Sequence, residues 1–217
     1  MGWQWGGGWL ASLGFSDFAG STLVHAAGGA AALAGAIVLG PRVGRFSGKQ
    51  LVPFANSSIP LATIGVFILW FGWFGFNGGS QLALGTFDDA TAVAKIFINT
   101  NLAAAGGVMT CALVTRLIGG KTDVVQMLNG ALGGLVAITA EPLAPVPFIA
   151  IIIGAIGGVV VVAGTALLVK LKIDDVVGAI PVHMFAGIWG TLAVPLTNAD
   201  TNFGAQLIGV LSINVFM

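Results

Sequence analysis

The chain has 217 residues, of which 57% are hydrophobic and only 7% are charged, with a formal net charge of zero and a mean hydropathy of +1.00. Soluble domains contain about 25% charged residues, so this composition excludes a soluble globular protein and predicts an all-α polytopic membrane protein. The single cysteine, Cys111, excludes a disulfide framework and a cysteine metal site, and the charge pattern offers no basic patch for nucleic acid.

Seven apolar runs are candidate membrane helices, because about 20 apolar residues are needed to cross a hydrocarbon core of about 30 Å. We assign them to one transmembrane domain covering residues 1–217, with spans near 18–40, 57–78, 93–117, 125–140, 147–169, 178–197 and 204–217. The seventh run stops at Met217 and is too short to cross. Small residues four apart favour close helix packing, and three glycine pairs have this spacing: Gly75/Gly79, Gly130/Gly134 and Gly154/Gly158.

Charged residues lie mainly in the connections between these runs. Seven of the eight basic residues follow the first, third or fifth run: Arg42, Arg45, Lys49, Arg116, Lys121, Lys170 and Lys172. The other connections hold acidic residues: Asp88, Asp89, Glu141 and Asp200. Because basic loops remain on the cytoplasmic side, we predict a protein of the plasma (inner) membrane whose residues 1–17 lie outside.

Residues 17–25 and 175–183 form an internal repeat. Each begins with an aspartate and ends, eight residues later, with one of the two histidines of the chain, so Asp17 matches Asp175 and His25 matches His183. The same alignment pairs glycines, Gly20 with Gly178 and Gly29 with Gly187. Eight helical residues rise about 12 Å, and the first and sixth spans run in opposite directions. Both histidines are therefore expected near the midplane, as in transporters built from inverted repeats.

The two histidines have three interpretations. An ionisable side chain inside an apolar span is by default a functional-site hypothesis, and two neutral imidazoles in contact can share a proton and present polar atoms to a small permeant. Alternatively, His25 and His183 only hydrogen-bond neighbouring helices. A metal site is disfavoured because zinc takes three or four protein ligands. Asp17 and Asp175 precede helical runs, where a carboxylate caps free N–H groups.

The run LWFGWFGFNGGS, Leu69 to Ser80, is rich in aromatic residues and ends at the predicted outer face. Such residues also form interfacial belts, which suits its first aromatic residues. Trp73 and Phe76 are three apart and share a helical face, which is suited to line a path. Trp5 lies on the same outer side, where an aromatic face can hold a cation by cation–π attraction.

Three segments, DFAGSTLVH, GWFGFNGGS and DDVVGAIPVHMFAGIWGTL, closely resemble, in this order, signatures of the ammonium transporter (Amt/Rh) family. The resemblance covers essentially the whole chain. It implies a fragment of an eleven-helix fold with two inverted five-helix repeats, lacking roughly the first four helices and the end of the last. It also implies a homotrimer with one pore per subunit.

The resemblance implies roles for seven residues at positions that match the family's motifs. The pore residues are the paired histidines His25 and His183, the inner gate phenylalanine Phe76 and the tryptophan Trp73; the outer cation site includes Trp5 and Ser80; and Asp17 supports the outer vestibule. Pro181 departs from the pattern, since the family usually has a small residue there. Proline is tolerated in a first helical turn.

The expected function is transport of ammonium or ammonia through a hydrophobic pore, and not an enzymatic activity. The cation is recruited outside and deprotonated, and ammonia passes the histidines while they relay the proton. The alternatives are an ammonium-sensing receptor that uses the same pocket and a partial chain without activity of its own. The expected partners are membrane lipid and, for the full-length protein, a regulator of the PII type; no cofactor is expected.

Overall fold

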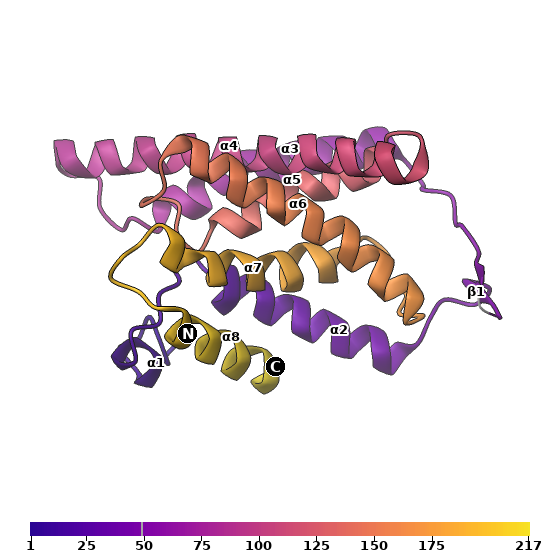
Figure 1. Ribbon diagram of the computed structural model, residues 1–217, viewed down its shortest axis with the longest axis horizontal. Coiled ribbons are helices and arrows are strands. Elements are labelled where there is room, and N and C mark those ends of the chain that lie inside the picture. The colour runs from indigo at the N-terminus through magenta and orange to yellow at the C-terminus, as the bar shows by residue number, and fades with distance from the viewer. Residues whose placement is uncertain (49) are drawn as a thin grey trace.

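The computed structural model describes residues 1–48 and 50–217, and almost all of its regular structure is helical (Figure 1), which confirms the predicted all-α fold class. The elements in chain order are α1 (Trp9–Ser12), η1 (Ser21–Ala26), α2 (Ala27–Leu39), β1 (Phe46–Ser47), β2 (Gln50–Leu51), α3 (Ile59–Gly79), α4 (Phe87–Gly119), α5 (Val124–Ile138), α6 (Pro147–Lys170), η2 (Ile180–Phe185), α7 (Ala186–Ala193), η3 (Val194–Leu196) and α8 (Phe203–Phe216). The two short strands pair antiparallel. Lys49, one of the basic residues predicted to be cytoplasmic, lies outside the described residues.

Four helical segments among the described residues are long and apolar enough to cross a membrane: Ser21–Leu39, Ile59–Gly79, Phe87–Gly119 and Pro147–Lys170. Three further apolar helices are shorter than the roughly 20 residues that a perpendicular crossing requires; they are Val124–Ile138, Ile180–Leu196 and Phe203–Phe216. The predicted spans near 125–140 and 178–197 therefore correspond to short helices.

The helix α4 is longer than its apolar run predicts. It begins at Phe87, not near residue 93, because Thr86 and Asp89 form a capping box in which each side chain accepts the other's backbone N–H at 3.1 Å. Asp88 and Asp89, predicted in a connection, thus lie in the first helical turn. Thirty-three residues rise about 50 Å, so this helix exceeds the hydrocarbon thickness of about 30 Å.

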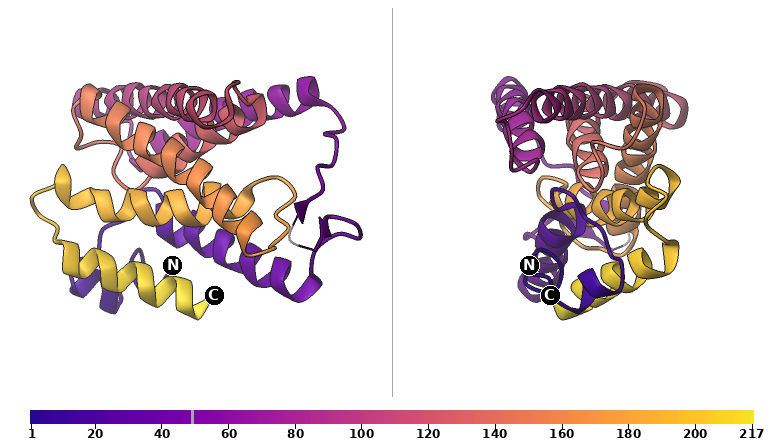
Figure 2. Two further views of the ribbon diagram at one scale, coloured as in Figure 1. Left: turned by 45° about the vertical axis from the view of Figure 1, so that its right-hand side comes forward. Right: turned by 90° about the vertical axis from the view of Figure 1, so that its left-hand side faces the viewer.

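The helices form two groups around α6. α3, α4 and α5 lie on one side of the bundle and α2, α7 and α8 on the other, while α6 runs obliquely between them (Figures 1 and 2). Glycines allow α4, α5 and α6 to pack closely, since a Cβ at Gly134 or at Gly154 would collide with the carbonyl oxygen of Ala103. By contrast, a Cβ at Gly75 or Gly79 would meet open space. Small-residue packing thus explains two of the three glycine pairs.

Candidate functional site

The two histidines of the chain lie side by side. Nδ1 of His25 is 3.2 Å from Nδ1 of His183, and the rings are stacked with centroids 5.2 Å apart and planes inclined by 16°. His25 is 9% exposed and His183 is half-buried. The repeat therefore delivers one imidazole from η1 and one from η2 to a common place inside the bundle.

The Nδ1–Nδ1 contact restricts the protonation of the pair. One Nδ1 must donate and the other accept, since a neutral imidazole carries one N–H and one lone pair. The two permitted arrangements differ by a shift of protons between the rings. His25 Nε2 is a donor in one arrangement and an acceptor in the other. This nitrogen is buried and has no hydrogen-bond partner among the described residues. A buried polar atom without a partner is costly, and a small polar permeant would satisfy it.

Two aromatic rings from α3 pack against His25. The Trp73 ring stacks on His25 with centroids 4.9 Å apart and planes inclined by 16°, and the Phe76 ring lies 5.3 Å from His25 and 5.8 Å from Trp73. Trp73 is buried, whereas Phe76 is 38% exposed. The site is therefore an apolar aromatic surface on which the imidazole nitrogens are the polar groups.

Buried polar residues hold Trp73 in place, and sequence reasoning did not identify them. Trp73 Nε1 donates to Thr139 Oγ1 at 2.9 Å, and this hydroxyl lies 2.6 Å from the Leu135 carbonyl oxygen and 3.1 Å from Asn77 Oδ1. Asn77 Nδ2 in turn donates to Thr100 Oγ1 at 3.0 Å. Amide and hydroxyl residues inside apolar runs are the signal that would have indicated this network.

The aspartates of the repeat cap the helices that carry the histidines. Asp17, fully buried, accepts four backbone N–H groups at 2.8–3.2 Å, from Gly20, Ser21, Thr22 and Leu23. Asp175 accepts four at 2.7–3.3 Å, from Val177, Gly178, Ala179 and Ile180. The matched glycines also share a conformation, with φ of 113° at Gly20 and 83° at Gly178, which favours glycine. Both aspartates therefore accept backbone N–H groups at a helix start, as the sequence predicted.

The other matched glycines allow the histidine helices to cross. A Cβ at Gly29 would collide with the backbone of Met184, the residue after His183. A Cβ at Gly187 would collide with the Ser21 carbonyl oxygen and approach Ala26, the residue after His25, at 3.2 Å. Each glycine therefore packs against the residue that follows the opposite histidine, and this close crossing brings the two rings together.

The residues predicted for an outer cation site have other contacts. Trp5 Nε1 donates to the Asp17 carbonyl oxygen at 2.9 Å, and its side chain is 44% exposed. Ser80 Oγ donates to the Phe76 carbonyl oxygen at 2.8 Å at the C-terminal end of α3. Trp5 thus contacts the start of the His25 helix, and Ser80 contacts Phe76, whose ring packs against His25.

The site offers hydrogen bonds to a small polar molecule but few ligands to a metal ion. Within residues 1–48 and 50–217, no group of three or more His, Cys, Asp and Glu side chains is placed to hold a metal. Two imidazoles against aromatic rings provide too few ligands for zinc. They do provide a lone pair and an N–H, which a small polar molecule can satisfy.

The chain matches the Ammonium Transporter Family over residues 1–214. It is 46% identical over 215 residues to the ammonium transporter Amt2 of Archaeoglobus fulgidus, an alignment that covers 93% of this chain and 44% of that protein. Among solved structures, a protein titled "Sensor Amt Protein" superposes with a TM-score of 0.90 at 36% identity, covering 96% of this chain and 54% of that one. Mep2 of Candida albicans gives a TM-score of 0.88 at 32% identity, with coverage of 99% and 50%. The chain spans about half the length of the curated relatives it matches.

Proposed function

Because the chain belongs to the ammonium transporter family, we propose that it transports ammonium across a membrane by conducting ammonia past the His25–His183 pair. The observation that supports this mechanism is the 3.2 Å Nδ1–Nδ1 contact beside aromatic rings, with His25 Nε2 unpartnered among the described residues. The pair offers a polar atom to a small molecule inside an otherwise apolar bundle.

Electrostatics favours conduction of the neutral species. A bare charge at membrane depth costs about 2.5 kcal/mol or more, whereas ammonia is neutral and small. Deprotonation of ammonium at the outer end therefore releases ammonia to the apolar path and one proton to the relay. The aromatic surface formed by Trp73 and Phe76 excludes competing hydrated cations because it offers them no oxygen ligands.

The imidazole pair relays this proton with balanced steps. In the arrangement where His25 Nδ1–H donates to His183 Nδ1, the Nε2 atom of His25 carries a lone pair. A proton enters at His25 Nε2, the Nδ1 proton moves to His183 Nδ1, and His183 Nε2 releases its proton on the other side. The pair then holds the opposite arrangement, and tautomerisation resets it.

We assign recruitment of the cation to Trp5 and Ser80, with Phe76 as the gate between them and the histidines. The exposed face of Trp5 is suited to cation–π attraction, and the Ser80 oxygen can accept from an ammonium N–H. Asp17 supports this mouth by capping the first turn of the His25 helix and by presenting its carbonyl oxygen to Trp5.

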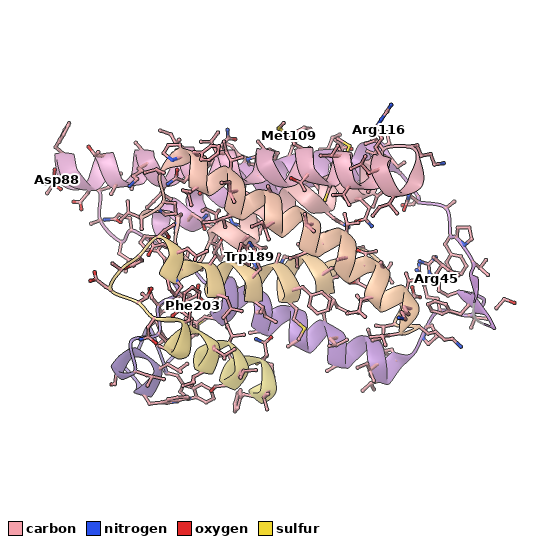
Figure 3. The ribbon with its side chains drawn as sticks, in the orientation of Figure 1. Arg45, Asp88, Met109, Arg116, Trp189 and Phe203 are labelled. Carbon is pink, nitrogen blue, oxygen red and sulfur yellow. The ribbon has the colours of Figure 1, made fainter. Side chains whose placement is uncertain are left out.

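The proposed orientation places the basic end of the bundle in the cytoplasm. Arg45 and Arg116 lie toward one end of the molecule and Asp88 at the other (Figure 3). By the positive-inside rule, residues 1–17 are outside and the basic loops inside, in the plasma (inner) membrane. By its family membership we further propose a homotrimer and a PII-type regulator for the full-length protein.

The test replaces both imidazoles with carboxylates, His25→Asp together with His183→Glu, in a host that lacks ammonium uptake. The relay predicts a changed electrogenic current and loss of discrimination against methylammonium. Arg116→Gln is the matched control, since its side chain is exposed at the end of α4. An unchanged current together with unchanged methylammonium exclusion would contradict the relay.

Ammonium sensing is a second candidate because a structurally similar protein is titled as a sensor. The same pocket would then bind the cation and change conformation without net transport. Measuring ammonium uptake by purified protein in vesicles separates the two: uptake supports the transporter, and binding without uptake supports the sensor.

A further inference from the structure

A salt bridge joins the end of the His25 helix to the start of the His183 helix. Asp174 accepts hydrogen bonds from Arg42 Nε at 2.7 Å, Arg42 Nη2 at 2.9 Å and the Arg42 backbone N–H at 3.0 Å. The Asp174 side chain is 2% exposed, and Arg45 Nε also lies 3.2 Å from Asp174 Oδ1. Arg42 follows α2 by three residues, and Asp174 directly precedes the capping residue Asp175. We call this contact the Arg42–Asp174 latch.

A neutral contact joins the other two ends. Gln206 of α8, fully buried, accepts from the Ser16 backbone N–H at 2.8 Å and donates to the Ser16 carbonyl oxygen at 2.7 Å. The same amide nitrogen donates to the Thr191 carbonyl oxygen in α7 at 2.9 Å. Ser16 directly precedes Asp17, so this Gln206–Ser16 latch joins the start of the His25 helix to the end of the His183 helix.

The two latches occupy the same position of the repeat. Ser16 and Asp174 are each one residue before the aspartate that caps a histidine helix, and each is held by a side chain that follows the opposite helix. Between the latches, the hydroxyls of Thr22 and Thr191 lie 2.7 Å apart. The imidazole pair is therefore bracketed by polar contacts at both ends of the helix crossing.

The geometry suits the Arg42–Asp174 latch to positioning more than to stability. A two-bond guanidinium–carboxylate contact fixes direction as well as distance. The Arg42 side chain is 38% exposed, so solvent screens the pair and limits its contribution to folding. The Arg42 guanidinium also holds the pKa of Asp174 at about 2, which keeps the latch charged at neutral pH.

We propose that Asp174 and Arg42, together with Gln206 and Ser16, are positioning residues that hold the histidine rings in relay distance. This inference rests on the proposed function. The Nδ1–Nδ1 distance of 3.2 Å is already at the upper end of hydrogen-bond distances, so a small rotation of either helix breaks the contact. The latches resist that rotation because each one ties the turn before a capping aspartate to the opposite helix.

The experiment uses the Arg42–Asp174 latch, because disrupting it leaves fewer buried polar groups without partners than disrupting Gln206 would. Asp174→Asn and Arg42→Gln are compared with the control Arg116→Gln in the protein expressed from its own gene. We expect the maximal ammonium uptake rate per inserted molecule to fall on the order of tenfold in both latch variants. The apparent KM should stay within about twofold, because recruitment takes place at the other end.

A second readout follows the rings themselves. Selective ¹⁵N-histidine labelling reports the Nδ1–Nδ1 hydrogen bond by NMR, with the signals of the two rings assigned from the variants His25→Asn and His183→Asn. We expect this signal to be lost in Asp174→Asn and kept in Arg116→Gln. A merely structural role would lower the amount or the thermal stability of inserted protein and leave the rate per molecule unchanged.

The outcomes separate the two proposals. If the wild-type protein carries no ammonium, the proposed function fails, and the NMR signal alone decides the latch. If Asp174→Asn loses the NMR signal but transports at the wild-type rate, the relay fails and the latch stands. If the signal persists in Asp174→Asn, the latch is overturned whatever the rate.

Discussion

Replacing Gly29 with alanine tests whether the helix crossing sets the histidine geometry. A Cβ at Gly29 would collide with Met184 N and would lie 2.7 Å from Met184 Cβ and 2.8 Å from Met184 Cα. Ordinary van der Waals contact begins at about 3.4 Å. The two helices must therefore separate by at least about 0.7 Å at the residue that follows His183, because the contact with Met184 N is shorter still.

This separation is enough to break the imidazole contact. Added to the 3.2 Å Nδ1–Nδ1 distance, it gives about 3.9 Å, beyond hydrogen-bonding range. The cost in folding is partly offset: overpacking destabilises by about 1–3 kcal/mol, whereas glycine to alanine within a helix gains about 1 kcal/mol. Gly29→Ala should thus lose most of its transport rate per molecule while its unfolding free energy changes by about 2 kcal/mol or less.

The adjacent residue supplies the control. A Cβ at Gly28 meets nothing within 4 Å, so Gly28→Ala changes the same helix by the same chemistry without moving Met184. Uptake of ¹⁵N-labelled ammonium, normalised to inserted protein, is measured for both variants, together with thermal unfolding in detergent. Equal rates per molecule in the two alanine variants would refute the argument that this crossing positions the rings.

Three further predictions concern the caps, the support of Trp73 and the pH dependence. Asp17→Asn should destabilise the protein by about 2 kcal/mol, because four backbone N–H groups lose a charged acceptor; an unchanged unfolding temperature in detergent would contradict this role. Thr139→Val leaves Trp73 Nε1 buried without its partner and should destabilise the fold by about 1–3 kcal/mol. Trp73→Phe removes the donor itself, so it should leave no unpaired group but should reduce uptake by changing the ring beside His25. Thermal unfolding and uptake of both variants check this. Because Arg42, and to a smaller extent Arg45, lower the pKa of Asp174 from 3.8 to about 2, the contribution of these ion pairs is complete above about pH 4 and is lost as the pH falls towards about 2. Unfolding curves between those pH values should show this loss in the wild type and not in Asp174→Asn.

Several features of the fold could be predicted because they depend on local sequence. The apolar runs indicated the helices, and the paired motifs at Asp17 and Asp175 indicated two capped helices of opposite direction. The start of α4 could not be read from hydropathy, because the capping box at Thr86 and Asp89 extends the helix beyond its apolar run. The short helix α1 was also missed, since its four residues lack a periodic pattern.

The candidate site was predicted in part. The sequence pointed to His25, His183, Trp73 and Phe76 as neighbours along one path, and the structure brings these four rings together. It did not point to Thr139, whose hydroxyl holds the Trp73 indole from another helix. The partner of a buried donor depends on which residues of distant segments face it, and no local pattern encodes that.

By itself, the sequence determined the membrane class, the internal repeat and the position of each histidine along its own helix, because hydropathy and spacing act along one helix at a time. Only the tertiary structure decided that the rings meet through their Nδ1 atoms and that Arg42 and Gln206 hold the helix ends. The physical reason is that rotation about each helix axis and the crossing of two helices are set by close contacts such as Gly29 with Met184. Those contacts join residues more than 150 positions apart.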